Sequence, residues 1–254
     1  RPCRLIDESL MTYCVAMNLA EGLVFVSDSR TNAGVDHIAT YRKLHVFGVP
    51  GERLIVLQSA GNLATSQSVI SLLRQRLSGD GSHLHNVGNL FEAVGLVGAT
   101  LREVLARDAS ATLGQGVDLG CSFLVGGQIG CESPRLFNIY PQGNFIESTE
   151  DTPYFQIGES KYGKPILDRA LKHTTPLQQA LRCALISFDS TIRSNLSVGM
   201  PLDLLVYHRN SLEVPVGYRV CEGDAYFEGI CGHWGAGLRQ LLGELPAPPE
   251  AYWG

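Results

Sequence analysis

The sequence predicts an α+β protein in which antiparallel β-sheets carry helices on their outer faces. Two observations predict this class. Strands and helices come in runs, in the order ββββ, αα, βββ, αα, ββ, α, and do not alternate one by one as βαβ units do. The strands are short, rich in β-branched and aromatic residues, and joined by glycine-rich turns. In the 254 residues, the 44% that are hydrophobic are enough for a sizeable core, and the 28 glycines are enough for many turns.

The first third of the chain predicts a β-meander followed by two helices. The segments TYCVAMNL and GLVFVSDS are strand-like, and the three residues AEG between them indicate a hairpin turn. Helical periodicity begins at Asn62, the expected N-cap. The predicted strands are residues 12–19, 22–29, 43–48 and 53–60, and the predicted helices are residues 62–77 and 87–106.

The rest of the chain repeats this alternation of strand runs and helix runs. Three short strands come next, then two helices, two strands and a last helix. The second helix of the pair has a clear apolar stripe and a proline, Pro176, in its first turn. The predicted strands are residues 121–127, 135–141, 144–148, 202–209 and 217–222, and the predicted helices are residues 164–172, 175–195 and about 226–242.

No proline- or serine-rich linker divides the chain, which predicts one domain over residues 12–245. Residues 1–11 are expected to be an N-terminal extension, either upstream sequence or a propeptide. Residues 246–254 are expected to form a polar C-terminal tail.

Composition and charge exclude several function classes. The net charge is -5 and the 20 lysines and arginines are scattered, so no basic surface for a nucleic-acid backbone is expected. No segment approaches the roughly twenty apolar residues that cross a bilayer. The seven cysteines are odd in number and form no C-x-x-C pair. We therefore expect a cytoplasmic protein with reduced cysteines and neither a nucleic-acid nor a membrane partner.

Thr12, which follows Met11 at the head of the first strand, is a candidate nucleophile. If Thr12 began the mature chain, its hydroxyl would lie beside a free α-amino group that can serve as its base. The three-residue turn AEG favours a hairpin register in which the numbers of two paired residues add up to an even value. In that register Asp28 would lie on the same sheet face as Thr12 and about one rung away. Taken alone, such a threonine is more often an ordinary strand residue.

Lys43 and Gly61 strengthen this hypothesis. Lys43 opens the third strand, from which its ammonium could reach Thr12 and Asp28 and lower the pKa of the hydroxyl and the amine. Gly61 stands at a strand-to-helix junction, where a backbone N–H can point at a developing oxyanion. Taken alone, Lys43 would be interpreted as a surface lysine, and Gly61 as an ordinary glycine at the end of a strand.

Together these residues resemble the proteasome β-type fold of the N-terminal nucleophile (Ntn) hydrolases, and in detail the bacterial proteasome-like Anbu family, the ancestral β subunit. The resemblance extends from Met11 to about residue 242. The matching segments are MTYCVAMNL, GLVFVSDSRTNAGVDHI, RKLHVF, SAGNLATSQ, QIGESKYGKPILDRAL and SNLSVGMPLDLLVY.

The resemblance implies a four-layer αββα sandwich and a threonine-type peptidase that cleaves peptides or unfolded proteins. It implies a ring or open ring-like homo-oligomer, and no metal or organic cofactor. Thr12 would be the nucleophile, Asp28 and Lys43 its charged partners, Gly61 the oxyanion donor and Ser197 the support of the amine. Thr31 and Asn32 fall where such subunits bind the substrate backbone, and Ser59 where they line the first specificity pocket.

The chain departs from the proteasome pattern in two places. Ser194 stands where an aspartate is usual, and residues 158–160 read GES in place of Gly-Ser-Gly. Glu159 and Ser160 are both candidates to replace the missing serine. These departures keep open the hypothesis of a catalytically silent scaffold subunit. A third hypothesis is an amidase that acts on a small metabolite, because the same chemistry opens any accessible amide.

The proposed chemistry requires the active chain to begin at Thr12, because with Met11 attached the α-nitrogen is an amide and cannot accept a proton. Met11 could be removed as a translation start by an aminopeptidase, or residues 1–11 could be a self-cleaved propeptide. The bulky side chain of Met11 disfavours self-cleavage, which favours the first route.

His83 and His85 form an H-x-H pair that could bind a metal ion. The pair lies between two predicted helices without further ligands in the sequence nearby, so we expect a solvated loop and no metal site.

Overall fold

The computed structural model describes residues 12–32, 38–112 and 118–253. The chain divides into two compact units, one that ends at Glu222 and a second that comprises Gly223–Gly254. The N-terminal extension predicted for residues 1–11 lies outside the described residues.

In the described part of the first unit, the strands form two five-stranded antiparallel sheets and a small ribbon. The first sheet has the order β10 (Tyr154–Gly158), β1 (Tyr13–Leu19), β2 (Gly22–Asp28), β11 (Leu202–His208), β12 (Tyr218–Val220). The second has the order β5 (Leu44–Val49), β6 (Arg53–Gly61), β7 (Cys121–Ile129), β8 (Arg135–Ile139), β9 (Phe145–Glu147). The ribbon pairs β3 (Arg30–Asn32) with β4 (Ile38–Thr40).

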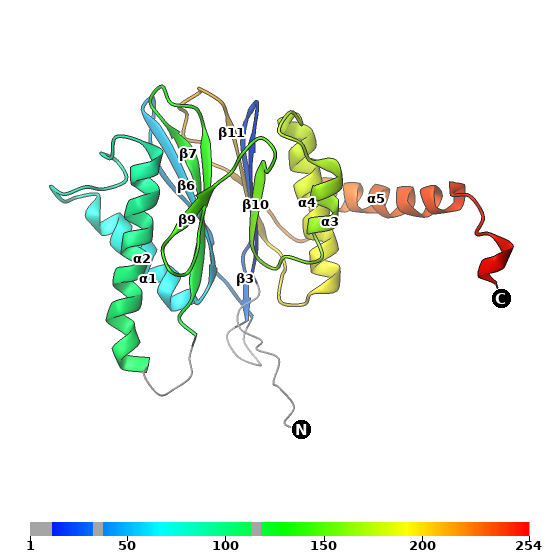
Figure 1. The fold of residues 1–254 in the computed structure, drawn as a ribbon, viewed down its shortest axis with the longest axis horizontal. Coiled ribbons are helices and arrows are strands. Elements are labelled where there is room, and N and C mark those ends of the chain that lie inside the picture. The colour runs from blue at the N-terminus through cyan, green and yellow to red at the C-terminus, as the bar shows by residue number, and fades with distance from the viewer. Residues whose placement is uncertain (1–11, 33–37, 113–117, 254) are drawn as a thin grey trace. The chain divides into compact units, whose positions relative to one another are not determined.

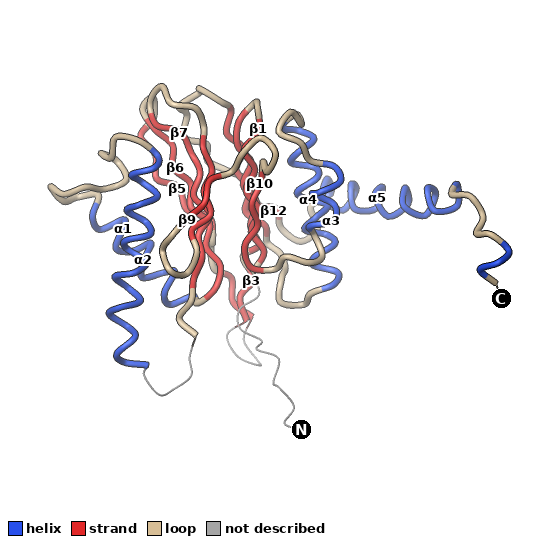
Figure 2. The backbone as a smooth tube through the Cα atoms, viewed as in Figure 1, coloured by secondary structure: helices blue, strands red, loops and turns tan. Residues whose placement is uncertain are grey.

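Helices cover the outer faces of both sheets, as Figures 1 and 2 show. The pair α1 and α2 packs on β6, β7 and β8, whereas α4, with α3 beside it, packs on β1 and β2. The first unit is therefore a four-layer αββα sandwich, which confirms the expected fold. The helices are α1 (Leu63–Arg76), α2 (Leu90–Thr112), α3 (Lys164–Ala170) and α4 (Leu177–Ser194).

The alternation of side chains along each strand explains the layers. On β6, Ile55 and Leu57 face the helices and join the apolar cluster under α1 and α2. The intervening Leu54 and Val56 face the other sheet, where they meet Phe25 of β2. Both faces of the central strands are buried, so the site described below rests on a rigid base.

Three strands and one turn differ from the prediction. The sequence indicated neither the β3–β4 ribbon nor β10, which pairs with β1 over its whole length. The hairpin turn was also wrong: Leu19 pairs with Gly22, so the turn has two residues, Ala20 and Glu21. Gly22 belongs to β2, where a Cβ would lie 1.9 Å from the carbonyl oxygen of Tyr207 on the neighbouring strand.

The second unit consists of helix α5 (Ala225–Glu244) and a short 3-10 helix, Glu250–Tyr252. Asp224 caps α5, because its carboxylate accepts a hydrogen bond from the N–H of Phe227 at 2.9 Å. Of the helices in the described residues, none is both long enough and apolar enough to cross a membrane.

Candidate active site

Thr12 lies directly before β1, and only 5% of it is exposed. Its carbonyl oxygen accepts a hydrogen bond from the N–H of Glu159 at 2.6 Å. Gly158 has φ of 82°, and a Cβ at this position would lie 1.9 Å from the same carbonyl oxygen. The head of β1 is therefore held by main-chain contacts with the end of β10, and these contacts require glycine at position 158.

Asp28 and Lys43 form a buried ion pair near Thr12. The Lys43 Nζ lies 2.7 Å from Asp28 Oδ1 and also donates to the carbonyl oxygen of Arg30 at 2.7 Å. The N–H of Tyr13 donates to the same Asp28 oxygen at 3.0 Å. Burial raises the pKa of Asp28, and the Lys43 ammonium and the Tyr13 N–H oppose that rise. The carboxylate thus fixes both the lysine and the residue that follows the candidate nucleophile.

The register of the β1–β2 hairpin, which positions Asp28, differs from the sequence prediction. Cys14 pairs with Ser27 and Val15 with Val26, so the paired residue numbers have an odd sum. The two-residue turn causes this register, and it places Asp28 on the other sheet face from Thr12. Asp28 contacts the site through the main chain of Tyr13 and the side chain of Lys43.

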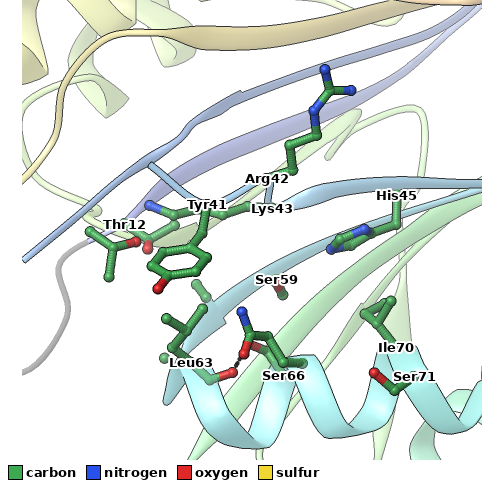
Figure 3. A pocket seen from close by; sticks show the side chains of 14 residues that line it. Thr12, Tyr41, Arg42, Lys43, His45, Ser59, Leu63, Ser66, Ile70 and Ser71 are labelled. Atoms are coloured by element: carbon green, nitrogen blue, oxygen red, sulfur yellow. Dashed lines mark hydrogen bonds between the residues drawn. The ribbon is translucent and has the colours of Figure 1, made fainter. Parts of the chain in front are cut away.

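A pocket of about 310 Å³ opens beside Thr12 (Figure 3). In the figure the Lys43 side chain extends toward Thr12, and His45 lies at the opposite end of the pocket. Five residues predicted from the sequence line it together: Thr12, Thr31, Lys43, Ser59 and Gly61. The other lining residues are Tyr41, Arg42, His45, Ala60, Leu63, Ser66, Gln67, Ile70 and Ser71.

Gly61 ends β6 and has φ of 106°, a conformation that glycine adopts without strain. A Cβ there would lie 2.4 Å from the carbonyl oxygen of Gly120, so no other residue fits. Asn62 follows and caps α1 by accepting the N–H of Thr65 at 3.1 Å. The strand-to-helix junction predicted from QSAGN is confirmed, and it directs the N-terminal turn of α1 along the pocket.

Asn32 lies in β3, where its backbone pairs with Ile38, next to Thr31, which lines the pocket. The Asn32 side chain is outside what the structure describes.

His45 is a lining residue that sequence reasoning missed. It stands two positions after Lys43 on β5, and strand alternation was the signal that could have placed it on the same face. Burial lowers the pKa of His45 to about 4, and the positive charges of Arg74 and Arg42 add to this, whereas Asp203 opposes it. The imidazole is therefore neutral at pH 7.

This lowered pKa predicts a pH-dependent stability. The pKa of His45 is about 4 in the folded state and 6.5 in the unfolded state. The contribution of neutral His45 to the free energy of unfolding is therefore complete above pH 6.5 and is lost as the pH falls toward 4. The total loss is about 3 kcal/mol. Urea unfolding of the wild type and of His45→Gln at pH 7 and pH 4.5 measures it: the wild type should lose more stability than the variant. His208→Gln, at an exposed position, is the control, and equal losses in the wild type and His45→Gln would contradict the prediction.

Glu159, Ser160, Ser194 and Ser197, the residues expected around the amine of Thr12, do not line the pocket. Glu159 is buried, and its carboxylate accepts hydrogen bonds from the Asn195 side chain and from two backbone N–H groups. The N–H of Ser197 donates to Asn195 Oδ1 at 3.0 Å. Ser194, the last residue of α4, and Ser160 are exposed. Of the two candidates left open by the sequence, the buried one is Glu159, and Asn195 is a partner that sequence reasoning missed.

His83 and His85 lie in the loop between α1 and α2, with ring centroids 6.3 Å apart. The described residues contain no group of three or more histidine, cysteine, aspartate or glutamate side chains placed to hold a metal ion. Neither histidine lines the pocket beside Thr12.

Comparison with known proteins shows the family to which the chain belongs. The sequence profile of the family described as "Proteasome subunit" matches residues 11–206. The chain is 68% identical to the Anbu protein in the structure "Helical Assembly of the Anbu Complex from Pseudomonas aeruginosa", with a TM-score of 0.92 and coverage of 95% of this chain and 100% of that one. This chain belongs to the Anbu family of proteasome-type proteins.

Two further Anbu structures are similar along almost the whole chain. Anbu from Yersinia bercovieri is 57% identical, with a TM-score of 0.88 and coverage of 94% of this chain and 100% of that one. A Gly-1 mutant of Anbu from Hyphomicrobium sp. strain MC1 is 47% identical, with a TM-score of 0.88 and coverage of 94% and 99%. Comparison with the curated proteins gave no match.

Proposed function

We propose that this Anbu chain is an N-terminal threonine peptidase that cleaves peptide bonds through an acyl-enzyme on Thr12, inside an oligomer of its own copies. The observation that carries the proposal is the pocket in which Thr12, Lys43 and Gly61 meet, with Lys43 held by Asp28 behind it. A buried ion pair costs desolvation free energy, and buried charged groups beside a pocket are typical of functional sites. The proposal includes a cytoplasmic location and peptide or unfolded-protein substrates.

In the proposed reaction, Thr12 Oγ attacks the carbonyl carbon of the scissile bond while the α-amino nitrogen of Thr12 takes the hydroxyl proton. The Gly61 N–H stabilises the oxyanion that forms. When the C–N bond breaks, the departing nitrogen receives the proton from the α-amine and an ester remains on Thr12. A water molecule then hydrolyses this ester, with the amine again acting as the base.

Lys43 serves this reaction through its charge. An ammonium next to the hydroxyl and the α-amine favours the deprotonated form of both, and the amine then works as a base near neutral pH. The reaction also requires a free α-amine, so we propose that the active chain begins at Thr12.

A threonine-directed covalent probe tests the proposal. A β-lactone or an epoxyketone is incubated with the natively expressed protein, and intact mass gives both the N-terminal residue and the extent of labelling. We expect a chain that begins at Thr12 and carries one probe, attached to Thr12 in the peptide map. A chain that begins at Thr12 and stays unlabelled would favour the scaffold hypothesis. A labelled chain that still carries Met11 would show that another group is the base.

Substrate profiling separates the peptidase from the amidase hypothesis. Both use the same acyl chemistry, so labelling by the probe does not distinguish them. A library of fluorogenic peptides and a set of small amides, each compared with the Thr12→Ala variant, does. Turnover of small amides alone would refute the peptidase proposal.

The proposed self-assembly is supported by the helical assembly named for the Pseudomonas aeruginosa relative and by the surface of α5. This helix exposes a stripe of large apolar side chains at positions spaced as i, i+4, i+7, i+8 and i+11. Such a stripe is typical of a surface that is covered in an assembly. Its members are Trp234, Leu238, Leu241, Leu242 and, at the C-cap directly after the helix, Leu245.

A charged α5 is therefore expected to disrupt assembly. In Leu238→Asp/Leu242→Asp, two carboxylates would have to be buried in the contact, so the oligomer should dissociate into smaller species. Light scattering coupled to size-exclusion chromatography measures the mass. Gln240→Asp, which adds a charge on another face of the same helix, is the control and should assemble normally. An unchanged mass in the double variant would place the contact elsewhere.

A further inference from the structure

Glu159 is a buried carboxylate whose hydrogen bonds come from uncharged donors. It is 4% exposed and follows Gly158 directly. Its Oε1 accepts the N–H groups of Ser160 and Lys161, both at 2.8 Å, and its Oε2 accepts Asn195 Nδ2 at 2.8 Å. Among the described residues, no lysine or arginine forms an ion pair with it. A buried charge without a counterion is costly, so this arrangement calls for an explanation beyond packing.

The main chain at one end of this contact holds Thr12, and the main chain at the other end carries Ser197, the residue expected to support the amine of Thr12. On one side, the N–H of Glu159 donates to the carbonyl oxygen of Thr12 at 2.6 Å. On the other side, Asn195 ends α4, and its Oδ1 accepts the N–H of Ser197 at 3.0 Å. The Glu159–Asn195 hydrogen bond therefore connects the segment that holds Thr12 with the segment that carries Ser197.

We infer that Glu159 and Asn195 are a positioning pair that fixes Thr12 and Ser197 relative to each other, and this inference rests on the proposed function of Thr12. Neither side chain needs to touch the substrate. The carboxylate is suited to the role because one oxygen holds its own turn, through Ser160 and Lys161, while the other holds Asn195. Because Asn195 also accepts from Ser197, its amide orientation is fixed from both ends.

The pair makes a specific prediction about two conservative substitutions. In Glu159→Gln, the new amide NH₂ faces the NH₂ of Asn195, so two donors meet, and turning Asn195 over would break its bond to Ser197. In Asn195→Asp, two carboxylates face each other, and they cannot both remain ionised without repulsion. Each single variant should therefore displace the segment beside Thr12.

The double variant Glu159→Gln/Asn195→Asp restores the match of one donor and one acceptor between the two side chains. The carboxylate is then at position 195 and the amide at position 159. At position 159 the new amide oxygen accepts from Ser160 and Lys161, and the new NH₂ donates to one oxygen of the carboxylate introduced at position 195. The other oxygen of that carboxylate accepts from Ser197. A misplacement of about 1 Å can cost about 100-fold in rate, so each single variant should slow labelling of Thr12 by roughly 10- to 100-fold. The double variant should return to within about threefold of the wild type.

The experiment measures two quantities in the full chain for the wild type, both single variants and the double variant. The first is the second-order rate of Thr12 labelling by the β-lactone probe, and the second is the midpoint of urea unfolding. We expect both to be lowered in each single variant and restored together in the double variant. Glu150→Gln, which removes an exposed carboxylate, is the matched control and should change neither.

Failure of this inference can be told apart from failure of the proposed function. If the wild type is never labelled, the proposed function fails and the inference, which rests on it, fails with it. If the wild type is labelled, the proposed function stands and the variants test the inference alone. If Glu159→Gln is labelled at the wild-type rate, or the double variant is labelled no faster than the slower single variant, the positioning role is overturned. If the midpoints recover in the double variant but the labelling rates do not, the pair is structural only, which also overturns the inference.

Discussion

Thr12→Ala is expected to abolish acyl-enzyme formation while the fold and the assembly persist. The substitution removes the proposed nucleophilic oxygen, and no other hydroxyl lies beside an α-amino group in the proposed active chain. The backbone contact between the Thr12 carbonyl oxygen and the Glu159 N–H does not depend on the side chain and should remain. Probe labelling and peptide hydrolysis should both fall to background, as measured by intact mass and by fluorogenic turnover.

Thr12→Ser is the matched control for this substitution. It keeps the hydroxyl and the α-amine and removes one methyl group, so it should remain open to labelling, at a reduced rate. Circular dichroism and light scattering should show the same fold and mass for both variants. Hydrolysis retained by Thr12→Ala would refute the assignment of the nucleophile.

Lys43→Ala is expected to lower the labelling rate by several orders of magnitude, through loss of the charge that favours the deprotonated hydroxyl and amine. The variant also leaves Asp28 buried without its counterion. Breaking a buried pair in this way costs about 3–5 kcal/mol, so the free energy of unfolding should fall as well. Labelling kinetics and urea unfolding measure the two effects on the same preparation.

A second variant separates catalysis from stability. Asp28→Asn/Lys43→Met removes both buried charges, and the amide oxygen introduced at position 28 can still accept the N–H of Tyr13. Its stability should recover toward the wild type, because no unpaired charge is buried, whereas its labelling rate should stay as low as that of Lys43→Ala. Lys172→Ala, at an exposed lysine, is the control. A rate within about tenfold of the wild type in Lys43→Ala would remove Lys43 from the proposed machinery.

The fold could be predicted because most of its elements have strong local signals. The apolar runs of β1, β2, β6 and β7 and the amphipathic pattern of α4 each indicate their own structure. By contrast, β10 is a five-residue edge strand that is only partly apolar, and its pairing with β1 is decided by the rest of the fold. The register of the β1–β2 hairpin was wrong because the turn residues AEG do not state whether Gly22 belongs to the turn or to the strand.

The candidate site was predictable where residue type and element boundary coincide. Thr12 at a strand start and Gly61 at a strand-to-helix junction are examples, and both line the pocket. Asn195 was not predictable in the same way, because nothing in the segment SNLS states that its side chain meets a carboxylate 36 residues earlier in the chain. Contacts of this kind arise only when α4 and the end of β10 are brought together by the sheets.

The strand pairing of β1 has a consequence for biosynthesis. The Thr12 end of the chain is made early, yet its neighbours β10 and, beyond β2, β11 are made more than a hundred residues later. Contacts between segments so distant in sequence form slowly, because the intervening loop must close before they yield any free energy. A nascent chain that ends before β10 lacks both Gly158 and Glu159. The main-chain contacts that hold Thr12 at the head of β1 therefore cannot form in it. Any reactivity of Thr12 would therefore be delayed at least until β10 and Glu159 have been made, and chains truncated before β10 would lack this support for Thr12.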